Sequence, residues 1–256
     1  MAARNRPSPR EFDVLKSQAL SQNMHRVTIG GTAMENFPPD QIGGYVKLFL
    51  PSLENETKPA VRTYTIRHQR ANALDIDFAL HGQAGQSNGP ATRWALSAKP
   101  GDKIMIGGPG PAKPLPPGFD SYLIFGDMTA LPAIGANLER LDRSASGTAF
   151  IEVCSEDDKQ DIQCPDGVDI NWVINPMPGM KSVLTDKLEA VDWSKLGRVY
   201  VWAACEFTTM RGLRAILGEK VGLGRDRVYI SSYWKHGLNE DNHKVAKRTD
   251  AMSLTA

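Results

Sequence analysis

The run Arg62-Thr63-Tyr64-Thr65 combines residue types that can bind a phosphate-bearing aromatic ligand. On a strand, Arg62 and Tyr64 share one face, because successive side chains point to opposite sides. The guanidinium of Arg62 matches phosphate oxygens, and the ring of Tyr64 would lie against a flat ring system. Thr65 would hydrogen-bond a reactive ring nitrogen through its backbone or its hydroxyl. The same alternation also fits a half-buried strand with a surface arginine.

The turn Gly89-Pro90-Ala91-Thr92 follows after one intervening strand and would open a helix. Its backbone N–H groups are suited to a pyrophosphate, since the N-terminus of a helix attracts anions. Gly89 and Ala91 would let the backbone come close, and Thr92 would add a hydroxyl. An ordinary proline-started helix is the plain alternative. Together the two segments suit a large flat cofactor with a diphosphate tail, and FAD is the candidate.

A second group of candidate residues lies at strand ends in the other half of the chain. Gly126-Asp127-Met128-Thr129 follows a predicted strand, where a nicotinamide dinucleotide would cross a parallel sheet. We expect cofactor contacts at Asp127 and Thr129, and Thr129 is also a predicted helix N-cap. Ala203 and Glu206 occupy the corresponding position on a later strand, and Glu206 would orient the nicotinamide amide. The chain has no G-x-G-x-x-G fingerprint, so the phosphate signal here is weak.

The acidic turn Ser155-Glu156-Asp157-Asp158 bears on the choice of electron donor. A 2′-phosphate at this turn would meet charge of its own sign, which favours NADH over NADPH. NADPH and an electron-carrier protein such as ferredoxin stay open as donors.

Several cations are placed where they could meet an anionic ligand. Lys47 shares a strand face with Tyr45 and Phe49, away from the aliphatic face. A helix cap and an acidic first turn are predicted at Asn239-Glu240-Asp241. Three cations follow in the same helix at i, i+3 and i+4, namely Lys244, Lys247 and Arg248. Cations late in a helix are also what the helix dipole favours without any ligand.

The candidate FAD-binding residues lie in a part of the chain whose pattern is typical of β-strands. From about residue 13 to 110 short strand patterns alternate with turn residues, for example over 45–50, 61–68 and 74–80. Strands at this spacing predict an antiparallel flavin-binding barrel, interrupted by one helix over 91–98.

The stretch 107–118 holds five prolines and four glycines and is predicted to lack regular structure, with a linker over 111–120. Strands are then expected at 122–125, 149–154, 170–174, 199–203 and 228–231, and helices at 130–141, 182–190 and 208–221. This alternation predicts a doubly wound parallel sheet, an NAD(P)H-binding domain over 121–236. Residues 1–12 are expected to be flexible, and 237–256 to form a C-terminal helix and tail. The fold class is therefore β followed by α/β, as in ferredoxin reductase-like flavoproteins.

Composition excludes several other classes. The formal net charge of +1 gives no general reason to bind nucleic acid or an anionic membrane, and we expect neither partner. No apolar stretch approaches the ~20 residues of a membrane helix, and the basic start lacks the apolar core of a secretory signal. The three cysteines, Cys154, Cys164 and Cys205, lack C-x-x-C spacing and are typical of reduced thiols in the cytoplasm. We also expect the protein to be a monomer.

Six ordered blocks give the chain a resemblance to a known family. They are RTYTIR, DIDFALHG, GPATRWALSAKPGD, GDMTALPAI, VWAACEFTTMRGLR and VYISSYWKHG, and the similarity runs from about residue 12 to 245. The chain resembles the siderophore-interacting proteins, which are FAD-containing ferric-siderophore reductases. The resemblance implies a flavin-binding barrel, a nicotinamide-binding domain, and cytoplasmic reduction of the iron of a ferric siderophore, hydroxamate or catecholate. It departs from the family pattern at Cys205 and Ser232, where glycine is usual.

The resemblance also extends the set of site residues. It implies that His81 and Gly82 lie beside the cofactor, whereas a lone histidine is otherwise more often structural. It implies a basic cluster at the siderophore pocket, for which Lys47, Lys244, Lys247 and Arg248 are the candidates, with Lys113 and Lys235 in reserve. Two further functions stay open: a flavin reductase that serves a ferredoxin, flavodoxin or oxygenase, and a siderophore-binding accessory protein with a vestigial flavin.

Overall fold

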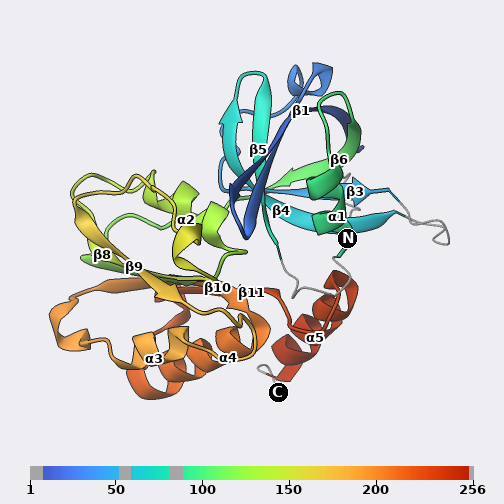
Figure 1. Ribbon diagram of the computed structural model, residues 1–256. Coiled ribbons are helices and arrows are strands. Elements are labelled where there is room, and N and C mark those ends of the chain that lie inside the picture. The colour runs from blue at the N-terminus through green and yellow to red at the C-terminus, as the bar shows by residue number, and fades with distance from the viewer. Residues whose placement is uncertain (1–7, 52–58, 81–88, 254–256) are drawn as a thin grey trace, which may run out of the picture. The chain divides into compact units, whose positions relative to one another are not determined.

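The computed structural model describes residues 8–51, 59–80 and 89–253, and the chain divides into two compact units, residues 1–114 and 115–256. The first unit is a closed barrel in the order β1-β2-β5-β4-β3-β6, and every strand pair in it is antiparallel (Figure 1). Its elements are β1 (Arg10–Ser21), β2 (Met24–Gly30), β3 (Tyr45–Leu50), β4 (Ala60–Arg70), β5 (Ala73–Ala79), α1 (Pro90–Ser97) and β6 (Lys103–Gly110), with a short 3-10 turn at Thr32–Met34. The predicted barrel and the α-helix that interrupts it are confirmed.

Apolar side chains at alternate positions of the strands fill the barrel. On β3, Val46, Leu48 and Leu50 are buried to 1% exposure or less, whereas Tyr45 on the other face is 38% exposed. The interior is apolar and joins residues of all six strands with the buried face of α1. Burial of this much apolar surface is the main driving force for folding the unit.

The strands extend further at both ends of the unit than the sequence predicts. Strand β1 begins at Arg10, inside the stretch expected to be flexible, because Phe12 is fully buried and pairs with Ile104 of β6. Strand β6 runs on to Gly110, inside the stretch 107–118 that was predicted to lack regular structure.

Glycine explains the second of these differences. Lys47 pairs with Gly107 and Tyr45 with Gly110 across β3 and β6. A Cβ at Gly110 would lie 2.1 Å from the ring of Tyr45, and one at Gly107 would lie 3.2 Å from the ring of Phe49. The absence of side chains therefore lets two aromatic rings lie over the strand, and glycine here indicates close packing rather than a linker.

The second unit is a five-stranded parallel sheet in the order β11-β10-β7-β8-β9. Its elements are β7 (Ser121–Gly126), α2 (Leu131–Leu138), β8 (Ser146–Val153), β9 (Gly167–Ile174), α3 (Leu184–Glu189), β10 (Val199–Glu206), α4 (Phe207–Ala215), β11 (Val228–Trp234) and α5 (Glu240–Ser253). A π-helical turn at Ile216–Val221 extends α4, and 3-10 turns lie at Glu156–Asp158, Trp193–Lys195 and Arg225–Arg227. The doubly wound sheet is confirmed.

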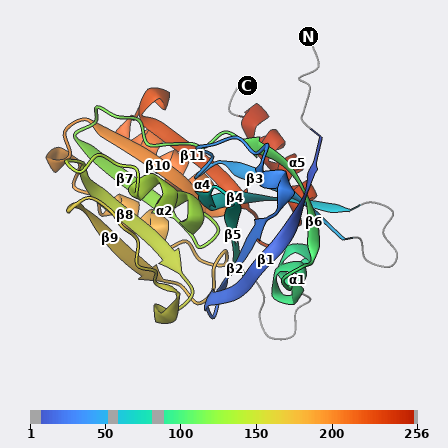
Figure 2. The same ribbon diagram turned by 90° about the horizontal axis from the view of Figure 1, so that it is seen from above.

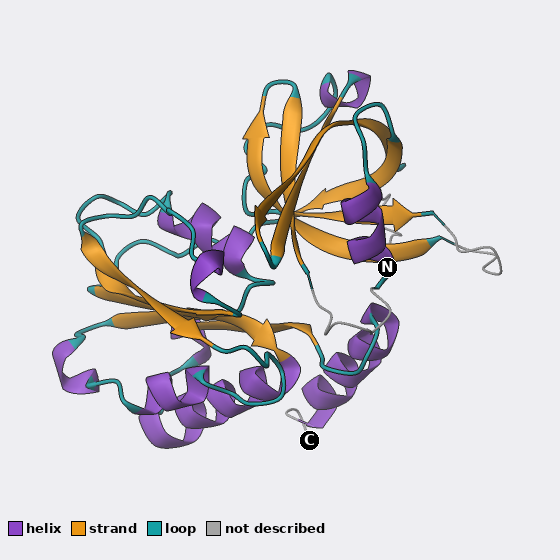
Figure 3. Cartoon of the chain, viewed as in Figure 1, coloured by secondary structure: helices purple, strands orange, loops and turns teal. Residues whose placement is uncertain are grey.

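Helices cover both faces of this sheet. Figure 3 shows α2 on one face and α3 and α4 on the other, and Figure 2 shows the strands running side by side. The core under α3 and α4 contains Phe125, Val201 and Leu213, all fully buried. The strand order reverses at β7, which has β8 on one side and β10 on the other, so the carboxyl ends of these strands form the expected ligand edge.

Candidate functional site

The register of β3 and β4 divides the predicted flavin-binding residues between two faces. Directly opposite residues of an antiparallel pair lie on the same face. Leu48 pairs with Arg62 and Val46 with Tyr64, so Arg62 and Tyr64 lie on the face that carries the buried residues of β3. By the same rule Thr63, paired with Lys47, lies on the opposite face, and Thr65, paired with Tyr45, lies there too. The predicted grouping of Arg62 with Tyr64 is confirmed.

An aromatic row connects β4 to the helix. The ring centroid of Tyr64 lies 4.3 Å from that of Phe78 on β5, and Phe78 lies 5.8 Å from Trp94 on α1. Tyr64 is therefore half-buried and held by packing against the barrel core. The half-buried guanidinium of Arg62 donates to the carbonyl of Val61 at 3.0 Å. These contacts place the strand and the start of α1 in one packed cluster of the barrel unit.

The start of α1 has the features of an anion site. Its N-cap residue is Gly89, no side chain caps it, and its first turn contains no acidic residue. Among the described residues, nothing lies within 4 Å of a Cβ placed at Gly89, so these residues leave open space at the turn. Ala91 and Thr92 are buried, at 6% and 7% exposure. The guanidinium of Arg62 and an uncapped, positively polarised helix start fit a diphosphate group, and hence FAD. His81 and Gly82 lie outside the described residues.

The sheet edge of the second unit is arranged differently, because the carboxylate oxygens of Asp127 accept hydrogen bonds from other groups of the protein. The residue is 4% exposed. Its Oδ2 accepts hydrogen bonds from the backbone N–H of Glu206 at 2.8 Å and from Nε1 of Trp234 at 2.7 Å. Its Oδ1 accepts the backbone N–H and the hydroxyl of Thr129, at 2.9 and 2.5 Å. Asp127 thus ties the ends of β7, β10 and β11 together.

The prediction of an N-cap at Thr129 is wrong. Helix α2 begins at Leu131, its N-cap residue is Ala130, and no side chain caps it. The hydroxyl of Thr129 is directed back to Asp127 instead, because a short Asx-type turn satisfies both groups before the helix starts.

Glu206 caps the next helix. Its Oε2 accepts the backbone N–H groups of Thr208 and Thr209, the latter at 3.2 Å, at the start of α4. Its Oε1 accepts the N–H of His236 at 3.2 Å, and the side chain is 3% exposed. Ala203 is fully buried in the core under α3 and α4, so its side chain does not reach the sheet edge. Glu206 is therefore placed as a capping residue, and a cofactor contact by the Ala203 side chain is not supported.

Glu152, at the end of β8, was not predicted from the sequence as a site residue. Its carboxyl is 5% exposed and accepts a hydrogen bond from Nδ2 of Asn175 at 3.1 Å. Burial, reinforced by the charges of Asp127 and Glu206, raises the pKa of Glu152 to about 8, against the opposing hydrogen bond from Asn175. A lone charged residue in the apolar run Ile151-Glu152-Val153 was the available signal.

The thiols at this edge respond to the same environment. Burial raises the pKa of Cys154 to about 11, with the charges of Asp158, Glu152 and Asp127 adding to the effect. Burial also raises the pKa of Cys205, which is 1% exposed. Both thiols are therefore protonated and inert at neutral pH.

The acidic turn after β8 is a capping box. The backbone N–H and the hydroxyl of Ser155 both donate to Asp158 at 3.0 Å, and Asp158 is fully buried. Glu156 pairs with Lys159, and Asp157 is exposed. The turn therefore presents less negative charge to a ligand than its sequence indicates.

The predicted cations on α5 have different environments. Lys244 pairs with Glu240 at 2.9 Å on its own helix, and Arg248 is exposed. The ammonium of Lys247 is instead directed to β11. Lys47 lies half-buried on the barrel face predicted for it. The reserve candidates also differ: Lys113 is exposed, and Nζ of Lys235 lies 4.6 Å above the ring of Phe207.

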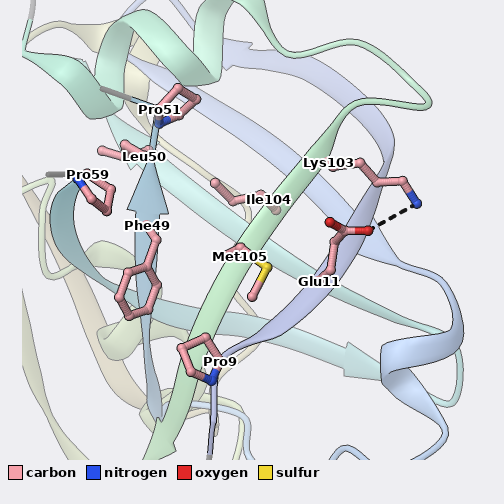
Figure 4. A pocket seen from close by; sticks show the side chains of 9 residues that line it. All are labelled: Pro9, Glu11, Phe49, Leu50, Pro51, Pro59, Lys103, Ile104 and Met105. Atoms are coloured by element: carbon pink, nitrogen blue, oxygen red, sulfur yellow. Dashed lines mark ion pairs between the residues drawn. The ribbon is translucent and has the colours of Figure 1, made fainter. Parts of the chain in front are cut away.

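A pocket of about 410 Å³ on the barrel is separate from all these residues. Figure 4 shows Glu11 and Lys103, paired at 3.7 Å, at its polar side, and the ring of Phe49 within it. It is lined by Pro9, Glu11, Phe49, Leu50, Pro51, Pro59, Lys103, Ile104 and Met105. None of the predicted site residues lines this pocket.

The described part of the chain has neither a metal-binding cluster nor a helix that could span a membrane. Within residues 8–51, 59–80 and 89–253, no group of three or more His, Cys, Asp and Glu side chains has a metal-binding arrangement. Over the same ranges, no helix has both the length and the apolar character that a membrane crossing requires.

Comparison with solved structures identifies the general class. The fold matches the siderophore-interacting protein SipS from Aeromonas hydrophila with a TM-score of 0.82 and 33% identity, over 96% of this chain and 98% of that one. It also matches ferredoxin-NADP+ reductase from Plasmodium falciparum with a TM-score of 0.67 over 88% of this chain and 96% of that one; at 15% identity this likeness concerns the fold alone. The chain thus has a ferredoxin reductase-like fold.

Family models and curated relatives define the family. Residues 51–113 match the siderophore-interacting FAD-binding domain, and residues 119–237 match the siderophore-interacting protein model. Ferric vibriobactin reductase ViuB from Vibrio cholerae is 33% identical over 252 residues, which cover 91% of this chain and 92% of that protein. The NADPH-dependent ferric-chelate reductase of Escherichia coli is 25% identical over 88% of this chain and 92% of its own length. The chain belongs to the siderophore-interacting protein family and carries its FAD-binding domain.

Proposed function

We propose that this protein reduces the iron of a ferric siderophore, with electrons that NADH or NADPH supplies and that FAD transfers. Similarity over nine-tenths of the chain to a protein named ferric vibriobactin reductase carries the proposal. The barrel adds a second line of support, since a guanidinium and an uncapped helix start belong to one packed unit.

The barrel residues would hold the cofactor by complementary charge and shape. Arg62 and the backbone N–H groups at the start of α1 would bind the diphosphate, and the row of Tyr64, Phe78 and Trp94 would keep strand and helix in place. Thr63 and Thr65 add hydroxyl groups on the opposite face of β4. When bound, FAD supplies the conversion between two-electron hydride transfer and single-electron transfer.

The sheet edge of the second unit would hold the nicotinamide donor. Asp127 and Glu206 act indirectly, because their carboxylates fix the strand ends and the start of α4 that would surround the dinucleotide. The exposed carboxylate of Asp157 favours NADH, and the name of the Escherichia coli relative favours NADPH. Both donors therefore belong in the test.

Cations would attract the substrate, because catecholate chelates of ferric iron are anionic. Lys47 on the barrel and Lys244 and Arg248 on α5 are the side chains that we assign to this role. Iron is the substrate of the reaction. Oxygen ligands hold ferrous iron less tightly than ferric iron, so reduction releases it. We place this reaction in the cytoplasm, where free thiols such as Cys154 and Cys164 stay reduced.

The test is a steady-state assay of the purified, FAD-loaded protein under anaerobic conditions. NADH and NADPH are compared as donors, and a catecholate ferric chelate, a neutral hydroxamate chelate and oxidised ferredoxin as acceptors. The proposal predicts saturable reduction of a ferric chelate with one of the nucleotides. Fast reduction of ferredoxin without a saturable chelate reaction would favour a flavin reductase with a protein partner. Chelate binding that is undiminished when FAD is absent would favour an accessory protein.

A further inference from the structure

Helix α5 is too polar to be held in place by apolar burial. Among the apolar residues of its fourteen-residue span, Ala246 packs on the core, whereas Val245 and Met252 are 60% and 67% exposed. The free energy that positions an amphipathic helix normally comes from its buried apolar stripe. Polar contacts must therefore determine where α5 docks.

One helical face carries those contacts. His243, Lys247 and Asp250 follow each other at i, i+4 and i+7, so they lie on the same side of the helix. Asp250 accepts two hydrogen bonds of 2.8 Å from the guanidinium of Arg214 on α4, and Arg211 lies 3.3 Å away. This end of the face anchors α5 to α4.

The other two residues anchor the helix to β11, which is an edge strand of the sheet. Nε2 of His243 lies 2.9 Å from Oγ of Ser232, and the two residues are 4% and 2% exposed. The ammonium of Lys247 donates to Oγ of Ser231 at 3.0 Å and to the carbonyl of Ser232 at 2.9 Å. Burial lowers the pKa of both His243 and Lys247 from their ordinary values. We define these four side chains, Ser231, Ser232, His243 and Lys247, as the α5 latch.

The latch gives Ser232 a physical role. The hydroxyl is the group on β11 that His243 contacts, and a glycine at this position would leave the buried imidazole nitrogen without that partner. It also separates Lys247 from the other cations of α5. Lys244 and Arg248 lie at i and i+4 on a different face, where the ammonium of Lys244 pairs with Glu240 and Asp241 and Arg248 is exposed.

We propose that His243 and Lys247 are positioning residues: through Ser231 and Ser232 they fix α5 on β11, and the fixed helix presents Lys244 and Arg248 to an anionic ferric chelate. This inference rests on the proposed function and reassigns Lys247, which the sequence pattern grouped with the substrate cations. The ammonium of Lys247 is half-buried against β11, where its two acceptors lie, so it has little capacity left for a ligand. The ammonium of Lys244 also has two acceptors, Glu240 and Asp241 of its own helix, but its side chain is 42% exposed and stays open to a ligand.

Four variants of the full-length, FAD-loaded protein test the latch: Lys247→Met, Ser232→Gly, Arg248→Met and, as a charge-matched control, Lys187→Met at an exposed position of α3. Two quantities are measured for each. The first is amide hydrogen exchange of residues 243–252, and the second is the KM for an anionic ferric catecholate and for a neutral ferric hydroxamate.

Lys247→Met and Ser232→Gly should each speed exchange in α5 about tenfold. They should also raise the KM for the anionic chelate roughly fivefold at unchanged kcat, although Ser232→Gly removes no charge. Arg248→Met should raise the same KM with exchange unchanged, and Lys187→Met should change neither quantity. The KM for the neutral chelate should stay constant throughout.

Unchanged exchange in both Lys247→Met and Ser232→Gly would overturn the latch. Faster exchange with an unaltered KM for the anionic chelate would overturn the link between the helix position and the substrate. If the unmodified protein reduces no ferric chelate, the proposed function fails, while the exchange data still decide whether the latch holds α5.

Discussion

The barrel and the parallel sheet use their polar residues in opposite ways. At the start of α1 no side chain of the described residues caps the backbone N–H groups, and the same residues leave open space beside Gly89. At the carboxyl edge of the sheet, Asp127 and Glu206 are buried and their oxygens accept hydrogen bonds from the protein. The barrel thus keeps donors available for a ligand, whereas the sheet edge uses its acceptors to hold strand ends together. Position at a ligand edge alone does not make a residue a ligand contact.

Asp127→Ala should have the largest effect of the substitutions that test this difference. It removes the acceptor of four buried or half-buried donors, which are the N–H of Glu206, the Nε1 of Trp234, and the N–H and hydroxyl of Thr129. We expect a loss on the order of 4 kcal/mol in the free energy of unfolding, since each unpaired buried donor costs ~1–3 kcal/mol. Urea unfolding measures it, with Asp157→Ala in the exposed turn as the control. A loss no larger than that of the control would contradict the structural role.

Glu152→Gln should reveal the cost of the buried carboxyl. The pKa of Glu152 in the folded protein, about 8, lies above its ordinary value of 4.5, so the folded state holds the proton more tightly than the unfolded state does. Stability should therefore fall as the pH rises between these two values, and Gln keeps the acceptor for Asn175 without the charge. The variant should be more stable than the parent at about pH 8, by on the order of 3 kcal/mol, and equal to it at about pH 4.

Unfolding midpoints measured across this pH range test that prediction. Parallel pH profiles of the two proteins would show that Glu152 is not the titrating group. A parent protein that gains stability as the pH rises would contradict the sign of the argument.

Arg62→Ala tests the barrel side of the comparison. Removal of a charge-assisted phosphate contact should weaken FAD binding by about 1.5–3 kcal/mol while the unfolding free energy of the apoprotein changes little. FAD content after purification and the Kd from fluorescence titration report the first quantity. Arg143→Ala, an exposed arginine of the other unit, controls for loss of charge. Full FAD retention in Arg62→Ala would reject the assignment.

Lys47→Ala should have the smallest effect. A single half-exposed cation attracts an anionic chelate by ~0.5–1 kcal/mol, so the KM for a catecholate should rise roughly threefold and that for a neutral hydroxamate should not change. Added salt should narrow the difference between parent and variant. Equal effects on the two chelates would mean that Lys47 acts through packing.

Sequence periodicity predicted much of this fold for a simple physical reason. Strand β3 was placed at its observed bounds because Val46, Leu48 and Leu50 alternate with outward residues. Strand β6 was cut short at Gly107, because glycine and proline usually break structure and only the rings of Tyr45 and Phe49 make glycine favourable there. Alternation is a local property of the chain, whereas this packing depends on residues about sixty positions away.

The site was predictable to a smaller extent. Arg62 and Tyr64 lie on one face of β4 because strand side chains alternate, so their shared face could be predicted from the sequence. The roles of Asp127 and Glu206 depend in part on distant donors, which lie 79 and 107 residues from Asp127 and 30 residues from Glu206, and no local pattern reveals those donors. Lys247 looked like Lys244 in the helical pattern, but only the fold brings Ser231 and Ser232 beside it.

The central claim, that the barrel holds FAD for electron transfer to ferric iron, is tested most directly by a single-turnover experiment. The FAD-loaded protein is reduced with one equivalent of nicotinamide nucleotide without oxygen and then mixed with a ferric catecholate, while flavin absorbance and trapped ferrous iron are followed together. The account predicts that the oxidised flavin spectrum returns as ferrous iron appears, with two iron atoms reduced for each flavin. A reduced spectrum that persists, or a purified protein that takes up no FAD, would contradict it.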